Sequence, residues 1–213
     1  MSKTFKIPKK PYGSEIVYKK SDITLEPGFT ALVGCNGSGK TTLLRLIKEQ
    51  LLKENIPVFT YDNKTEGAST MISRAVLYGQ MPLAGTLATS SEGEQIMVCL
   101  GEIAQQIGSF IRKNSDSDEF WIFLDAIDSG FSIDNIIEIK DFFKDCLVPD
   151  VRGKGKEVHI LCSANSFEVA NGENCFDVIN GEYVTFKDYE EYKRFILSSR
   201  KTKDKRYKNG KKD

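Results

Sequence analysis

Residues 34–42 read Gly34-Cys35-Asn36-Gly37-Ser38-Gly39-Lys40-Thr41-Thr42. The run fits the pattern G-x-x-x-x-G-K-[ST], in which glycines let successive backbone N–H groups turn inward around phosphate oxygens. In such a loop the lysine reaches the β and γ phosphates and the next hydroxyl ligates Mg²⁺. We therefore predict that residues 34–42 bind a nucleoside triphosphate, with Lys40 on the phosphates and Thr41 on the metal ion.

The residues on either side of this loop predict a strand before it and a helix after it. The apolar run at 29–33 follows a Pro27-Gly28 turn, as expected of a buried strand. After the loop, apolar residues recur at helical spacing until about Asn55 and Pro57: Leu43, Leu44, Leu46, Ile47, Leu51 and Leu52. This context argues against the alternative, a Gly/Ser turn that only caps a helix, because the helix N-terminus would face an anion.

Length and composition favour one domain followed by a short tail. A chain of 213 residues with 40% hydrophobic content can bury one sizeable core. We predict a domain that binds a nucleoside triphosphate over residues 1–198 and a basic, disordered tail over 199–213, because Lys201–Asp213 carries seven Lys or Arg against two Asp. Such a tail is usually solvated, and binding to nucleic acid or to another anionic partner is the functional alternative.

Targeting signals and cysteines point to the cytoplasm. The sequence has no apolar run of about 18 residues and no apolar stretch near Met1, so we expect no membrane span and no secretion signal. The five cysteines are odd in number and lack metal-ligand spacing. We expect them to be reduced thiols.

A second apolar run, residues 120–124, ends at Asp125. A buried parallel strand would deliver this carboxylate to the same sheet edge as the phosphate loop, where it would hold Mg²⁺ together with Thr41. The alternative is an aspartate that merely caps the next helix. A further strand is expected at 157–163, and Val17-Tyr18 with residues 23–25 suggests a small β-lobe. Alternating strands and helices predict an α/β sheet with helices on both faces.

Between these motifs, the polar turn at 89–95 opens a predicted helix. Ser91 and Glu94 stand in the S-x-x-E relation of a capping box. Alternatively, the Ser91 side chain and the Gly93 N–H could form a second phosphate cradle, assisted by the positive end of the helix. Local sequence alone leaves both interpretations open.

Taken in order, the loop at 34–42, the segment Ser91-Glu92-Gly93-Glu94-Gln95 and the strand ending at Asp125 resemble the ABC-type ATPase family over about residues 13–180. The form with Glu after Gly is closer to its recombination and chromosome-maintenance branch than to transporter subunits. The resemblance implies an α/β P-loop NTPase, an ABC-type nucleotide-binding domain with a small N-terminal β-lobe and a short helical insertion. It also implies a homodimer that sandwiches ATP and Mg²⁺, with Ser91 and Gly93 acting on the nucleotide of the other chain.

Two positions depart from the family pattern. Ala126 stands where the family has the glutamate that polarises the attacking water, and Asn165 stands where it has a histidine that contacts the γ-phosphate. A methyl group cannot accept a proton, and loss of a general base typically costs about 10²- to 10⁴-fold in rate. Asp128 is either a substitute base or a residue that orders water or structure. The sequence therefore predicts slow hydrolysis, with Lys40, Asp128 and Asn165 as candidate catalytic residues.

For two further contacts, one to metal-bound water and one to adenine, the sequence offers more than one residue. For the residue that reaches metal-bound water, Asp62 and Asn63 both follow a strand at 58–61, and Asn63 fits by position. Gln80 fits by residue type, with a surface amide as the alternative. For adenine stacking, Tyr12 lies at a suitable distance before the loop, with Phe5 and Tyr18 as rivals. A core role is equally compatible with each aromatic residue.

Three functions remain at this stage. The first is an ATP-dependent dimer with weak hydrolysis that acts on nucleic acid or on a partner protein. The second is an ATP-gated interaction module without useful turnover, and the third is a transporter subunit. About 50 residues separate Lys40 from Ser91 without sustained heptads, so we expect no coiled-coil arm and little surface for a transporter. The resemblance also implies that a separately encoded effector can accompany such a protein.

Overall fold

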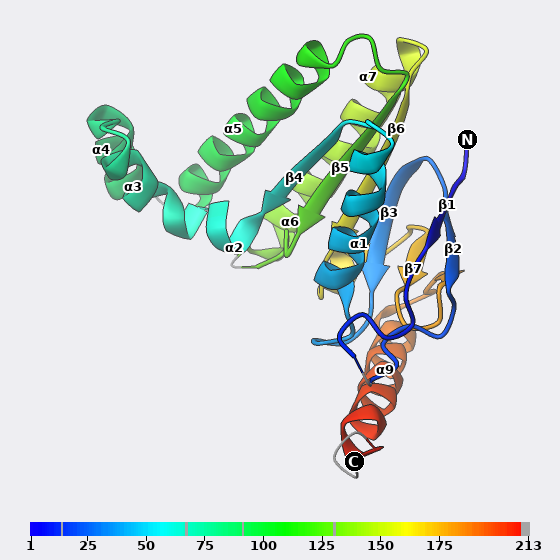
Figure 1. The fold of residues 1–213 in the computed structure, drawn as a ribbon. Coiled ribbons are helices and arrows are strands. Elements are labelled where there is room, and N and C mark those ends of the chain that lie inside the picture. The colour runs from blue at the N-terminus through cyan, green and yellow to red at the C-terminus, as the bar shows by residue number, and fades with distance from the viewer. Residues whose placement is uncertain (14, 67, 91, 130, 210–213) are drawn as a thin grey trace.

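A mixed, mostly parallel sheet forms the centre of the molecule (Figure 1). The computed structural model describes residues 1–13, 15–66, 68–90, 92–129 and 131–209. The six-stranded sheet has the order β4-β5-β6-β3-β7-β8, and only the β7–β8 pair is antiparallel. Its strands are β3 (Gly28–Val33), β4 (Val58–Asp62), β5 (Glu119–Asp125), β6 (Glu157–Ser163), β7 (Cys175–Asp177) and β8 (Glu182–Val184). The strands expected at 29–33, 58–61, 120–125 and 157–163 are therefore present.

A separate two-stranded sheet forms the small N-terminal lobe. In it, β1 (Lys3–Lys6) pairs antiparallel with β2 (Asp22–Leu25), and Phe5 stands opposite Ile23. The expectation of a strand at Val17-Tyr18 was wrong. The backbone N–H groups of both residues donate to the carbonyl of Lys9, which holds them in a loop instead of a ladder. The alternation of Phe5 and Ile7 with lysines was the better signal, because both apolar side chains are buried.

Helices cover both faces of the sheet, as alternating elements predict (Figure 1). The helices of the described residues are α1 (Lys40–Lys53), α2 (Asn63–Glu66), α3 (Ala68–Leu77), α4 (Met81–Thr89), α5 (Glu92–Lys113), α6 (Ile133–Asp141), the π-helix η1 (Phe142–Leu147), α7 (Val148–Gly153), α8 (Phe167–Ala170) and α9 (Tyr189–Asn209), and α3 and α4 lie away from the sheet (Figure 1). Helix α1 buries Leu43 and Ile47 in one core with Trp121. On the other face, α5 buries Ile103 and α6 buries Ile136 in a second core. Truncating a core residue such as Ile47 to Ala would cost about 2–5 kcal/mol.

The strand order decides where functional residues can meet. Strand β6 lies between β3, which leads into the phosphate loop, and β5, which ends at Asp125. Because the three strands are parallel, their carboxyl ends share one edge of the sheet. Residues that follow β6 therefore lie between the phosphate loop and Asp125.

The C-terminal helix differs from expectation. We expected disorder from residue 199, but α9 continues to Asn209. Tyr192 and Ser199 are buried, and the Cys35 backbone N–H donates to Ser199 Oγ at 3.1 Å. Packing against the phosphate loop therefore orders part of a sequence whose composition alone suggests a solvated tail.

The structure also bears on the cysteines and on membrane-spanning helices. All five cysteines are free thiols, and among them only Cys146 is exposed. Burial raises the pKa of Cys175 to about 12, so this thiol stays protonated. Over the described residues, none of the helices combines the length and apolar character needed to cross a membrane.

Candidate functional site

The phosphate loop needs glycine where the N-terminal lobe packs against it. Gly39 has φ 103°, and a Cβ at this position would lie 2.8 Å from Val17 Cγ1. The Tyr18 hydroxyl donates to the Gly39 carbonyl at 2.8 Å. Gly34 has φ 148°, and its Cβ would lie 2.6 Å from Ser38 Oγ. The loop therefore keeps its shape through residues without side chains and through direct contact with the lobe.

A cleft of about 350 Å³ opens over this loop. It brings together most of the residues that the sequence predicts to bind nucleotide and metal. Its lining includes Tyr12, Asn36, Gly37, Ser38, Gly39, Lys40, Thr41, Thr42, Asp125 and Asn165, together with Glu15, Val17, Ala126 and Ser163. The cleft is thus contributed by the lobe, the loop and the ends of β5 and β6.

Lys40 is held inside the cleft by oxygen atoms. Its Nζ donates to the Gly34 carbonyl at 2.7 Å, to the Cys35 carbonyl at 3.4 Å and to Asn165 Oδ1 at 2.9 Å. The side chain is buried, so its charge is desolvated and these polar contacts stabilise it. A phosphate oxygen would be a stronger acceptor than any of the three. The ammonium group is therefore placed to accept an anionic ligand.

Ser38 offers an independent test of whether an anion fits. Its side chain is only 1% exposed, and its Oγ has no hydrogen-bond partner within the described structure. Such an unsatisfied buried hydroxyl costs about 1–3 kcal/mol. Because Ser38 lines the cleft, a phosphate oxygen could satisfy this donor. The residues present therefore fit a bound polyphosphate.

The oxygen ligands expected for Mg²⁺ lie on the same cleft. Thr41 lies in the first turn of α1, and Asp125 ends β5. Ser163 Oγ, at the end of β6, donates to Asp125 Oδ1 and accepts the Ala126 backbone N–H at 3.2 Å. Ser163 therefore orients the aspartate, and the hydroxyl and carboxylate form a donor set that suits a hard cation.

Ala126 adopts a left-handed conformation at the cleft wall. Its φ is 53°, which is unusual for a residue with a Cβ, and its side chain is 8% exposed. The Ser129 N–H donates to its carbonyl at 2.9 Å. This turn places the Ala126 methyl group on the cleft beside Asp125. No proton acceptor occupies the position.

Asp128 anchors the backbone behind the cleft. Its Oδ2 accepts the backbone N–H groups of Asn165 at 2.6 Å and Ser166 at 2.7 Å. Asp128 is absent from the residues that line the cleft over the phosphate loop. Of the two roles open from the sequence, this geometry supports the structural one, because the carboxylate fixes the segment that carries Asn165.

Asn63 is not among the residues that line the cleft over the phosphate loop. It is buried at the start of α2, where its Nδ2 donates to the Ser129 carbonyl at 2.7 Å and its Oδ1 accepts from the Tyr61 hydroxyl at 3.2 Å. The preceding Asp62 instead lines a second cleft, of about 230 Å³, with Thr41 and Asp125. Asp62 is thus a better candidate than Asn63 for reaching metal-bound water.

The structure distinguishes the three aromatic residues that could stack on adenine. Tyr12 is 66% exposed at the mouth of the cleft, and its hydroxyl lies 2.7 Å from Thr42 Oγ1. The Arg45 guanidinium lies 5.7 Å from the Tyr12 ring centroid. Phe5 and Tyr18 are buried. Of the three, Tyr12 alone presents a ring that a base could reach.

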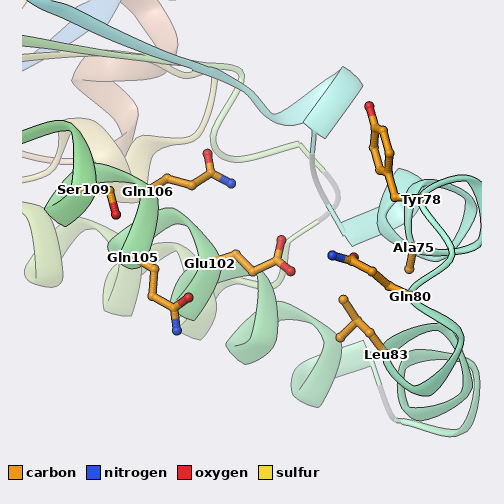
Figure 2. Close-up of a pocket in the computed structure, with 8 residues that line it drawn as sticks. All are labelled: Ala75, Tyr78, Gln80, Leu83, Glu102, Gln105, Gln106 and Ser109. Atoms are coloured by element: carbon orange, nitrogen blue, oxygen red, sulfur yellow. The ribbon is translucent and has the colours of Figure 1, made fainter. Parts of the chain in front are cut away.

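A further cleft, of about 510 Å³, lies between α3, α4 and α5, and Figure 2 shows side chains facing one another across it. Gln80 projects into this cleft, opposite Glu102 (Figure 2). The position of Gln80 therefore does not support contact with metal-bound water at the phosphate loop. Of the predicted signature pair, Gly93 lies in the first turn of α5, and Ser91 lies outside the described residues.

Several residues of the cleft were missed by sequence reasoning. Ser163 and Glu15 line it, and Ser199 and Lys203 of α9 contact the phosphate loop from outside. Ser163 could have been found, because it ends a predicted strand beside Asp125. The contacts of α9 carry no local sequence signal, because they depend on how a distant helix packs.

The mixed α/β fold, with its mostly parallel central sheet and the loop at residues 34–42, is consistent with a P-loop NTPase fold. A family model described as an AAA domain matches residues 23–109, which include the phosphate loop, α1 and β4. The match supports nucleotide binding, and it ends before Asp125, Ala126 and Asn165. A comparison with curated proteins finds no significant match.

Proposed function

We propose that this protein binds ATP with Mg²⁺ and hydrolyses it slowly, acting as a nucleotide-dependent switch. The observation that carries the proposal is the arrangement of Lys40, the orphaned Ser38 hydroxyl and Asp125 around one cleft. These groups suit a polyphosphate and a divalent cation. Mg²⁺ would neutralise developing phosphate charge, and Thr41 and Asp125 would hold it.

Slow turnover is supported by what surrounds the expected position of the attacking water. Ala126 supplies only a methyl group there, and Asp128 is engaged by two backbone N–H groups. Lys40 and Asn165 can still bind and orient the terminal phosphate, because both side chains line the cleft. We therefore expect this protein to bind ATP but to hydrolyse it slowly.

We further propose that ATP brings two copies together, as the resemblance to ABC-type ATPases of the recombination and chromosome-maintenance branch implies. In this arrangement the Ser91–Gly93 segment of one copy would contact the nucleotide of the other. The switch would act on nucleic acid or on a partner protein in the cytoplasm. An ATP-gated module without turnover is the second candidate, and the methyl group at position 126 favours it.

One experiment separates these functions. Phosphate release and molecular mass are measured with ATP, ADP and no nucleotide, for wild type and for Lys40→Ala. We expect slow release and an ATP-dependent dimer in the wild type only. Dimerisation with no release would favour the second candidate. Equal ATP affinity in the Lys40→Ala variant would contradict the proposed site.

A further inference from the structure

The C-terminal helix α9 contacts the phosphate loop at consecutive residues. The Cys35 N–H donates to Ser199 Oγ at 3.1 Å, and Lys203 Nζ donates to the Asn36 carbonyl at 3.2 Å. A Cβ at Gly37 would lie 3.4 Å from Lys203 Cδ, so the lysine stem passes directly over the loop. Helix α9 therefore forms an outer wall of the loop.

The same helix also holds the segment after β6. The Tyr192 hydroxyl donates to the Asn165 carbonyl at 2.8 Å, and burial raises the pKa of Tyr192, which keeps the hydroxyl protonated. Tyr192, Ser199 and Lys203 are seven and four residues apart, which places them along one face of the helix. One rigid element thus contacts both the loop and the residue that bonds Lys40.

We propose that Lys203 is a nucleotide-contacting residue, whose ammonium group moves from the Asn36 carbonyl to the terminal phosphate of bound ATP. The inference rests on the proposed function and extends it to a cation outside the sequence motifs. A phosphate oxygen carries more negative charge than a carbonyl, so a charge-assisted bond to it is stronger. The flexible lysine stem lets the charge shift while Ser199 keeps the helix in place.

One charged neighbour of Lys203 is the Asp204 carboxylate. Lys203 Nζ lies 3.6 Å from Asp204 Oδ1, and the Asp204 side chain is 54% exposed. An ion pair this exposed contributes little free energy to holding the ammonium group in place. A cation supplied from the same chain beside the phosphates is a known solution in P-loop NTPases. By linkage, bound ATP would in turn stabilise the position of α9 beside the nucleotide.

Affinities for ATP and ADP test the proposal in Lys203→Met, which keeps the stem over Gly37 and removes the charge. Lys205→Met is the matched control, because Lys205 is exposed on the same helix. Calorimetry should show a loss of about tenfold in ATP affinity for Lys203→Met, and of less than about threefold for ADP. Lys203→Arg should stay within about threefold of wild type, and the control should be unchanged.

Lysine acetylation followed by mass spectrometry gives a readout that is independent of binding measurements. ATP should protect Lys203 several-fold more than ADP does, with Lys205 unaffected. Equal ATP affinity in wild type and Lys203→Met would overturn the role of Lys203 while leaving ATP binding intact. A wild type that binds no ATP would overturn both the role of Lys203 and the proposed function.

Discussion

Lys40 Nζ donates to Asn165 Oδ1 at 2.9 Å, although 125 positions separate the two residues in sequence. Strand β6 lies between β3 and β5, so Asn165, which follows β6, lies between the phosphate loop and Asp125. An amide can donate to a phosphate or accept from the lysine, but it carries no charge. Its contribution should therefore lie in recognising the terminal phosphate.

Replacing Asn165 with Ala should weaken binding of ATP more than binding of ADP. One net hydrogen bond corresponds to about 0.5–1.5 kcal/mol, or a loss of roughly 2- to 12-fold in ATP affinity. Calorimetric titration with both nucleotides measures this difference. Asn171→Ala is the control, because Asn171 is also exposed but does not line the cleft. Equal losses for ATP and ADP would argue against terminal-phosphate recognition.

Replacing Ala126 with Glu should raise the rate of phosphate release. The backbone already adopts φ 53° with a Cβ in place, so a longer side chain adds no new backbone requirement. A positioned base contributes about 10²- to 10⁴-fold, and we expect at least the lower value relative to Ala126→Gln. Single-turnover assays with saturating ATP measure it. Release of many ATP-derived phosphates per second by the wild type would contradict slow turnover.

Substitutions of Asp128 distinguish an anchor from a base. Asp128→Asn keeps one oxygen that can accept the N–H groups of Asn165 and Ser166, so turnover should fall by less than about tenfold. Asp128→Ala removes the acceptor and should lower the free energy of unfolding by about 2–3 kcal/mol. Urea unfolding and phosphate release check both variants. Complete loss of turnover in a stably folded Asn variant would instead indicate a base.

His159 should make the protein less stable in mild acid. The ring is fully buried and stacks on Trp121 with centroids 4.0 Å apart, and Nδ1 lies 3.1 Å from the Glu26 carbonyl. Burial lowers the pKa of His159 from 6.5 to about 4, against the opposing effect of the Glu119 carboxylate. Between these values the unfolded chain binds a proton that the folded protein does not, so stability falls as pH falls from about 6.5 toward 4.

The expected loss from this histidine is about 2 kcal/mol between pH 7.5 and pH 5. Urea unfolding at the two pH values measures it. His159→Phe keeps an aromatic ring against Trp121 and removes the titrating group, so its free energy of unfolding should change less over the same interval. An identical pH dependence in the variant would assign the effect to other groups.

Much of the fold followed from local sequence, because its strands are short apolar runs and α1 follows a recognisable loop. Leu43 and Ile47 reveal the buried face of α1 by spacing alone. The β1–β2 pairing was harder to predict, since Phe5 lies among lysines and its partner strand is 18 residues away. The extent of α9 was missed, because its order depends on contacts such as Ser199 with Cys35.

The candidate site also contains residues whose positions could be predicted from the sequence and residues whose positions could not. The meeting of Lys40, Thr41 and Asp125 at one cleft could be predicted, because motif and strand position specify it together. Asn63 and Asp128 were assigned from position along the chain, which does not determine where a side chain points. Asn63 turns toward Ser129, and Asp128 turns toward the backbone of residues 165 and 166. Neighbouring residues on a turn can face opposite directions, so position along the chain does not determine which side chain enters a site.

Trp121, the chain's one tryptophan, is buried in β5 against His159, and it does not line the cleft over the phosphate loop. Its intrinsic fluorescence should therefore report the integrity of the core and stay nearly constant when nucleotide is added. A change in emission on adding ATP would mean that the central sheet itself deforms, which would connect the nucleotide to parts of the molecule that it does not touch.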